Sequence, residues 1–141
     1  MKKFWQLVSK RHLVFVIVLF ALVIGTSVVE AENKVKVEFG EAAVDIIAKR
    51  YSMNIPYDMV DSIELTPMPD PGEIIEGRDD MSIRYGTWIN DVWGEYAVCA
   101  DLGASNAIAV HLNDGQIFVF SRKSDAETQS IYETFQLHLN P

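Results

Sequence analysis

The chain has 141 residues, 49% of them hydrophobic and 11% aromatic, and its formal net charge is −8. This length supports one domain with a buried core, and the composition is typical of a globular rather than a disordered protein. An acidic chain repels nucleic acid and anionic lipid surfaces, so neither is expected as a partner. A single cysteine, Cys99, excludes an internal disulfide and a cysteine-based zinc site, and its apolar neighbours predict a buried thiol.

The basic part of the chain comes first and is followed by an uncharged hydrophobic segment. Residues 1–12 hold four of the twelve basic residues and no acid, whereas all twenty acids lie from Glu30 onward. Residues 13–29 carry no charge and are long enough for a short membrane helix. The positive-inside rule then places residues 1–12 in the cytoplasm and the chain after Glu30 outside it.

The same segment also resembles a secretory signal, because Val29-Glu30-Ala31 offers a weak small-x-small cleavage site. We expect an uncleaved single-pass anchor in the cell membrane, and secretion after cleavage is the alternative. The chain is thereby divided into a cytoplasmic N-terminus at 1–12, a membrane segment at 13–29, a linker at 30–33 and a domain at 34–141.

The pattern after residue 33 alternates between apolar and polar residues, which is typical of short strands. Such segments lie at 34–39, 42–49 continuing through 51–56, 61–66, 81–88, 95–100, 106–112 and 116–120. Residues 67–80 hold three prolines and two glycines, so we expect them to form the longest loop. Asn113-Asp114-Gly115 is a strong signal for a tight hairpin turn.

The last element is predicted to be an amphipathic helix. Ser124 and Glu127 have the spacing of a capping box, and Ile131, Phe135 and Leu139 recur at helical intervals. About seven short strands followed by one helix predict a mainly β fold, a sandwich or a barrel whose open end the helix closes.

Residues 54–139, about 60% of the chain, carry a family resemblance. The segments in order are NIPYDMVDSIEL, IRYGTW, WGEYAVCA and NAIAVHLNDGQIFVFSRKSDAETQSIYETF. This order is similar to that of the bacterial pleckstrin-homology-like domains, which occur in small membrane-anchored proteins. The resemblance implies a pleckstrin-homology-like barrel of about seven antiparallel strands, capped by the C-terminal helix and preceded by an N-terminal hydrophobic helix.

The resemblance implies no catalytic residues and no cofactor. Eukaryotic pleckstrin-homology domains often bind phosphoinositides through a basic cluster in the first hairpin loop. The corresponding turn here is Gly40-Glu41, which is short and acidic, so phosphoinositide binding is not expected.

Acidic and histidine residues are the other candidates for chemistry. The acids of the predicted loop are Asp70, Glu73, Glu76, Asp79 and Asp80, and their spacing does not match an EF-hand. We expect a solvated loop there, and a small hydrolase that uses residues 70–80 is an alternative function. The three histidines, His12, His111 and His138, are far apart in sequence, so no metal site is expected.

Four residues are candidates for contact with a protein partner. Trp88 and Trp93 flank a polar turn, and Arg122-Lys123 is the densest basic site after residue 30. The alternatives are packing of the tryptophans in the core or at its rim, and a solvated basic turn. With no catalytic constellation in the sequence, we expect a non-enzymatic, membrane-anchored binding or scaffold module that has a protein partner.

Overall fold

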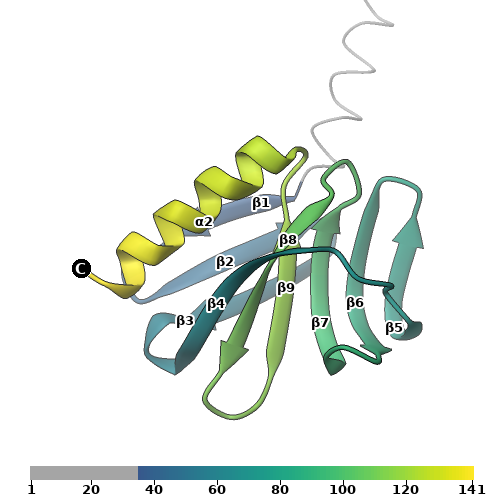
Figure 1. The fold of residues 1–141 in the computed structure, drawn as a ribbon, viewed down its shortest axis with the longest axis horizontal. Helices are drawn as coiled ribbons and strands as arrows, with labels where there is room; N and C mark the ends of the chain where they lie inside the picture. Colours follow the sequence, from purple (N-terminus) through teal and green to yellow (C-terminus); the bar gives the residue numbers. More distant parts are fainter. Residues whose placement is uncertain (1–34) are drawn as a thin grey trace, which may run out of the picture. The chain divides into compact units, whose positions relative to one another are not determined.

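The computed structural model describes residues 35–141, and the predicted membrane segment at 13–29 lies outside this range. The described residues form a mainly β structure with a C-terminal helix (Figure 1). The elements in chain order are β1 (Lys36–Phe39), β2 (Ala43–Ala48), β3 (Tyr51–Pro56), the short 3₁₀ turn η1 (Tyr57–Met59), β4 (Val60–Pro67), β5 (Glu73–Asp80), β6 (Ile83–Asn90), β7 (Gly94–Asp101), β8 (Asn106–Leu112), β9 (Ile117–Ser121) and α2 (Asp125–Leu139).

The strands form two separate sheets, and neither is closed into a barrel. The small sheet has the order β1-β2-β3, and the large sheet has the order β4-β8-β9-β7-β6-β5. Strand β9 lies between β7 and β8, so it pairs antiparallel with β8 and parallel with β7. The expectation of a barrel of about seven strands, all antiparallel, is therefore wrong in three details, because residues 35–141 form nine strands with one parallel pair and the two sheets stay open.

One additional strand arises where the sequence pattern continues without a turn signal. Lys49 adopts a left-handed backbone conformation with φ of 52°, and Lys49-Arg50 forms a two-residue turn between β2 and β3. Glycine or asparagine usually occupies such a position. The sequence offers neither here, which explains why residues 42–56 read as one continued segment.

The second additional strand is β5, which lies within residues 67–80, so the prediction of one long loop over this range is wrong. Only the first part of the predicted loop is irregular, and all three of its prolines precede β5. Residues 73–80 pair with β6 along their whole length, with an irregularity between Ile74 and Glu76. Strand β5 lies at the end of the large sheet and is exposed on both faces, so its sequence lacks the alternation that identifies a half-buried strand.

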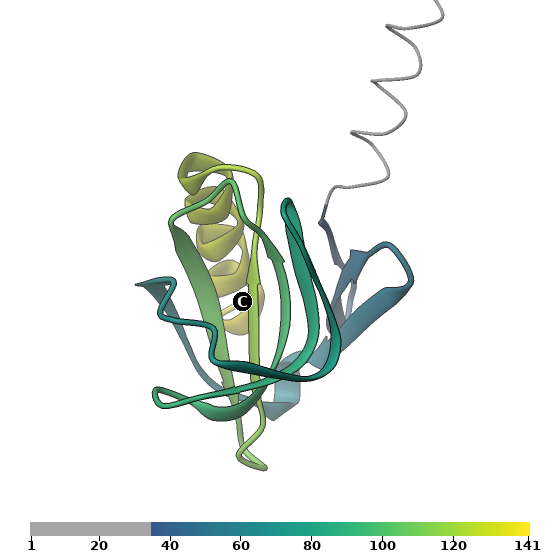
Figure 2. The ribbon, with the colours of Figure 1, turned by 90° about the vertical axis from the view of Figure 1, so that its right-hand side faces the viewer.

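The main core lies between the inner face of the large sheet, the small sheet and α2. The predicted helical stripe of Ile131, Phe135 and Leu139 faces this core, with Phe135 fully buried at its centre. The predicted cap is also confirmed, because the Glu127 backbone N–H donates a hydrogen bond to the Ser124 hydroxyl at 3.2 Å. Figure 2 shows the small sheet and the large sheet diverging toward β5 and β6.

A second cluster covers the opposite, outer face of the large sheet, and includes Trp88, Tyr96 and Val98. Residues 67–72, which connect β4 to β5, cross this face (Figure 1). The Tyr96 hydroxyl donates a hydrogen bond to the Pro71 carbonyl at 2.7 Å, which fastens the connection to the sheet. The central strands of the large sheet, β8, β9 and β7, are therefore covered on both faces at this point.

Within residues 35–141, no helix is both long enough and apolar enough to cross a membrane.

Burial makes Cys99 a probe of the core. The thiol is fully buried, and burial raises its pKa to about 12. We expect native Cys99 to react with a thiol reagent at neutral pH roughly a hundredfold or more slower than the unfolded chain does. The measurement is the reaction rate with a chromogenic disulfide, with and without denaturant. Equal rates in the two conditions would contradict the burial of this side chain.

Candidate binding cleft between the small sheet and the β5–β6 edge

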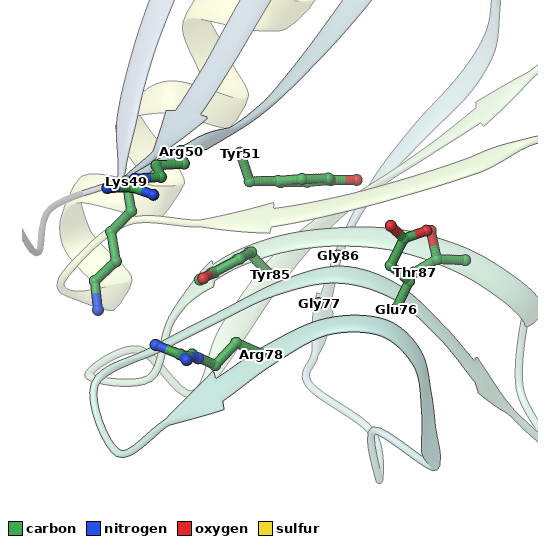
Figure 3. A pocket seen from close by; sticks show the side chains of 9 residues that line it. All are labelled: Lys49, Arg50, Tyr51, Glu76, Gly77, Arg78, Tyr85, Gly86 and Thr87. Atoms are coloured by element: carbon green, nitrogen blue, oxygen red, sulfur yellow. The ribbon is translucent and has the colours of Figure 1, made fainter.

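A cleft of about 710 Å³ lies where the two sheets diverge. We call it the β5–β6 cleft. Three short segments line it, namely residues 49–51 around the β2–β3 turn, 76–78 of β5 and 85–87 of β6 (Figure 3). The cleft is therefore built from both sheets. Residues 76–78 and 85–87 pair with each other, and residues 49–50 form the turn that the Ala48–Tyr51 pair closes.

Two glycines give the cleft a floor of bare backbone. Gly77 and Gly86 are directly paired across β5 and β6, with φ of 125° and 115°. A Cβ atom at Gly86 would lie 2.1 Å from the Glu76 carbonyl oxygen and 2.6 Å from the Gly77 Cα. Because only glycine permits this conformation and this approach, the floor carries no side chains.

Two tyrosines from different sheets form an aromatic wall. The rings of Tyr51 and Tyr85 are stacked with centroids 5.8 Å apart and planes 26° apart. Burial is the main cause that raises the pKa of Tyr51 above its ordinary value, and the charges of Cys99 and Glu76 add to it. The Tyr51 phenol therefore stays protonated at neutral pH and remains able to donate a hydrogen bond.

Charged side chains stand at both ends of the cleft. In Figure 3, Lys49 and Arg78 reach toward the end to which the Tyr85 hydroxyl points, whereas Glu76 lies at the other end beside Thr87. Hydrogen-bond donors, a carboxylate acceptor and aromatic surface within one concave site are suited to binding a polar ligand or a polypeptide.

An ion pair between Lys49 and Asp80 joins the small sheet to the large sheet beside the cleft. The same carboxylate closes the β5–β6 turn, because it accepts hydrogen bonds from the backbone N–H groups of Ser82 and Ile83 and from the Ser82 hydroxyl. The Lys49 ammonium is the largest cause that lowers the pKa of Asp80 well below its ordinary value, and the N–H group of Ile83 adds to it.

This depressed pKa predicts how stability depends on pH. A carboxylate whose pKa is lower in the folded protein than in the unfolded chain stabilises the fold at any pH above the pKa of the unfolded chain. This contribution is lost as the pH falls toward and through the pKa of the folded protein. Asp80→Asn keeps an oxygen acceptor for the turn but removes the charge. We expect it to lower the free energy of unfolding by about 1 kcal/mol or less at neutral pH, since the pair is partly exposed.

The test compares urea unfolding of the wild type and of Asp80→Asn between neutral and acidic pH. The difference between them should shrink as the pH falls below 3.8, the ordinary value for this carboxyl. Asp61→Asn, at an exposed position on β4, is the matched control. A difference that stays constant across this range would show that the ionised form of Asp80 does not contribute.

The acids of the predicted loop do not form one group. Asp70 accepts a hydrogen bond from the Gly72 N–H at 2.9 Å, and Asp79 accepts one from the Arg84 guanidinium at 3.1 Å. Within residues 35–141, no three His, Cys, Asp or Glu side chains are grouped so that they could hold a metal ion.

The two tryptophans predicted as contacts belong to the outer face of the large sheet. Trp88 is only 5% exposed, and the Arg84 guanidinium carbon lies 5.1 Å from its ring centroid. Trp93 is partly buried and packs edge-on against Tyr96, with ring centroids 5.1 Å apart. Little of the Trp88 ring is therefore available to a partner, whereas part of Trp93 is.

Arg122 and Lys123 lie far from Trp93. Arg122 donates a hydrogen bond to the Val35 carbonyl, and its guanidinium lies 3.6 Å from Glu127, whereas Lys123 is exposed. Because β7 and β9 are parallel, the residue before β7 and the residues after β9 lie at opposite ends of the sheet. The four predicted contact residues are thus not brought together on one surface.

Of the residues that line the cleft, sequence reasoning named only Glu76 as a candidate. Lys49, Arg50, Tyr51, Arg78 and Tyr85 come from three separate segments, and no motif links them. One signal was present, because a glycine inside a strand pattern often marks close approach of another backbone. Gly86 lies inside the predicted strand at 81–88 and meets this criterion.

In comparisons with known proteins, no family model, no curated protein and no solved structure matches this chain.

Proposed function

We propose that this chain is a non-enzymatic binding module of pleckstrin-homology-like fold, which residues 13–29 anchor at the outer face of the cell membrane. Its partner is a protein, and the β5–β6 cleft is its contact site. The fold assignment is supported by the two facing sheets and by the C-terminal helix that packs against their common core. The nine strands and the parallel β7–β9 pair distinguish it from a simple seven-stranded antiparallel barrel.

One observation carries the binding role. The cleft brings together a floor of bare backbone, a pair of stacked tyrosines and charges of both signs, between the small sheet and strands β5 and β6. Protein surfaces that bind a partner are enriched in tyrosine and arginine, and they surround these residues with polar groups.

The hydrolase alternative receives less support from the acidic residues. Asp79 forms an ion pair with Arg84, and Asp80 forms one with Lys49. The lowered pKa of Asp80 makes its carboxylate a weak base. A general acid or base needs a pKa near the working pH, which burial usually provides. The proposed binding role requires no such group.

The proposal is tested with a photo-crosslinking amino acid placed at Arg78 of the full-length chain in intact cells. Arg78 is exposed and lines the cleft, so a bound partner lies within reach of the probe. The same probe at Leu137, an exposed position on α2, is the control. A protein adduct specific to position 78 is the expected result. No adduct, or the same adduct from both positions, would reject the cleft as the contact site.

Anchoring is tested independently by the intact mass of the mature protein. A full-length chain in the membrane fraction supports the anchor, whereas a chain that begins at Glu32 identifies a secreted protein. The binding site is the same in both cases, because residues 35–141 are retained.

A further inference from the structure

Strand β5 is an open edge of the large sheet. It stands at the end of the strand order, and among residues 35–141 it pairs with β6 alone, so within this range the backbone groups on its other side have no strand partner. Seven of its eight residues are exposed, whereas β4 at the opposite end alternates between exposed and half-buried residues. Open edges of this kind are templates for the addition of another strand.

Exposed apolar side chains lie on both faces of the sheet at the first half of this edge. Ile74 and Ile75 of β5, Ile89 of β6 and Val92 of the β6–β7 turn are between 43% and 64% exposed. The last two line a groove of about 650 Å³ beside the start of β5. Large exposed aliphatic groups on one site usually mark a surface that a partner covers.

The charges around this site define the partner that it can accept. Asp70, Glu73 and Asp91 line the groove, and β5 carries four acids, Glu73, Glu76, Asp79 and Asp80, against one basic residue, Arg78. A second copy of this chain would bring the same acidic groove and a further formal net charge of −8 to this site. Like charges placed directly across a strand pair are destabilising, whereas opposite charges are favourable.

We propose that β5 binds an extended peptide segment in which basic and apolar residues alternate, and that this segment adds to the large sheet as a further strand. The inference rests on the proposed binding role and names the partner's chemistry. Backbone hydrogen bonds to β5 hold the segment, its apolar side chains cover Ile74 and Ile75, and its basic side chains lie on the other face, beside Glu73 and Glu76. Strand addition of this type takes affinity from the main chain and specificity from alternate side chains.

The bulge in β5 limits how the added strand can sit. The register shifts between Ile74 and Glu76, so the extra residue Ile75 bends the strand at the centre of the apolar site. Regular pairing with a long flat strand is interrupted there. A short segment fits along Glu76–Asp80 and reaches the groove with its end.

The test uses the full-length chain in phosphatidylcholine nanodiscs, whose neutral lipid does not attract a basic peptide. The probe is a capped peptide of alternating lysine and valine as long as β5, and the comparison peptide has glutamate in place of lysine. We expect the lysine peptide to slow amide hydrogen exchange within residues 73–80 and the glutamate peptide to leave it unchanged.

Charge reversal on the protein supplies the matched variants. Glu73→Lys with Glu76→Lys should weaken binding of the lysine peptide roughly tenfold, since two attractive pairs become repulsive. The pair Glu38→Lys with Glu41→Lys makes the same change of charge in and beside β1, and it should leave the affinity unchanged. Both changes are at exposed positions, so folding should be retained in each variant.

Three results would overturn the inference. They are equal protection by both peptides, protection outside β5 and its neighbours, and protection of residues 73–80 that grows with protein concentration in the absence of peptide. The last would identify a second copy as the occupant. The lysine peptide could leave amide exchange in residues 73–80 unchanged while the photo-crosslinking probe at Arg78 still gives a specific adduct. In that case the strand-addition inference is rejected, the partner binds the cleft in another way, and the proposed function stands.

Discussion

Phe135→Ala is expected to lower the free energy of unfolding by about 3–5 kcal/mol. The Phe135 ring is fully buried and packs against Phe39 of β1, Tyr57 of η1 and Phe120 of β9, with centroid distances of 6.0, 6.2 and 6.3 Å. It therefore joins the helix to the small sheet and to the large sheet at once. Its removal leaves a cavity that three separate elements would have to move to fill.

Leu137→Ala on the same helix is the matched control, because Leu137 is 72% exposed. Its effect on the free energy of unfolding should stay within about 0.5 kcal/mol. Chemical unfolding followed by tryptophan fluorescence measures both variants. If the two changes cost the same, α2 does not close the core in the way described.

Gly86→Ala has the second large expected effect, a loss of about 3 kcal/mol or more in the free energy of unfolding. Its new methyl group would meet backbone atoms of Glu76 and Gly77, at distances that no rotation of a side chain can relieve. Its positive φ of 115° adds strain for any residue with a Cβ atom. Strands β5 and β6 would have to separate, so amide hydrogen exchange in residues 73–80 should also accelerate.

Gly94→Ala distinguishes this clash from conformational strain alone. Gly94 also has a positive φ, 70°, but no atom lies within 4 Å of a Cβ built there. We expect a cost of about 1 kcal/mol, without a change in the exchange of β5. Similar losses from both substitutions would mean that close approach of the two strands is not what requires glycine at position 86.

Much of the fold was predictable because its signals are local. The hairpin turn at Asn113-Asp114-Gly115, the Ser124 cap and the helical stripe each depend on residues within a few positions of one another, and each was found as expected. The burial of Cys99 was likewise predictable from the apolar residues around it.

The parts that were missed depend on distant pairing. Nothing in the sequence of residues 73–80 indicates a strand, because their strand partner within residues 35–141 is β6 and both of their faces meet solvent. The strand order of the large sheet was not predictable either, because the place of β9 beside β7 depends on packing and not on a turn between them. Sequence patterns report burial and turns, but not which strands become neighbours.

The candidate site was missed for a related reason. The four predicted contact residues were chosen for their residue type, and the structure places Trp88 beneath the Pro67–Gly72 connection and Arg122 against Val35 and Glu127. The cleft instead collects ordinary charged residues and tyrosines at a point where the two sheets separate. Its position follows from the length and curvature of the sheets, which no single segment encodes.

The place of β9 in the large sheet also dictates the order in which the domain can be completed during synthesis. Before residue 117 emerges, the chain can form only two unconnected pieces of this sheet, β4 with β8 and the antiparallel unit of β5, β6 and β7. Strand β9 joins these pieces, and α2 follows it directly. A chain released from the ribosome before this point therefore has no closed core, and the domain gains its stable form only when its last residues have been added.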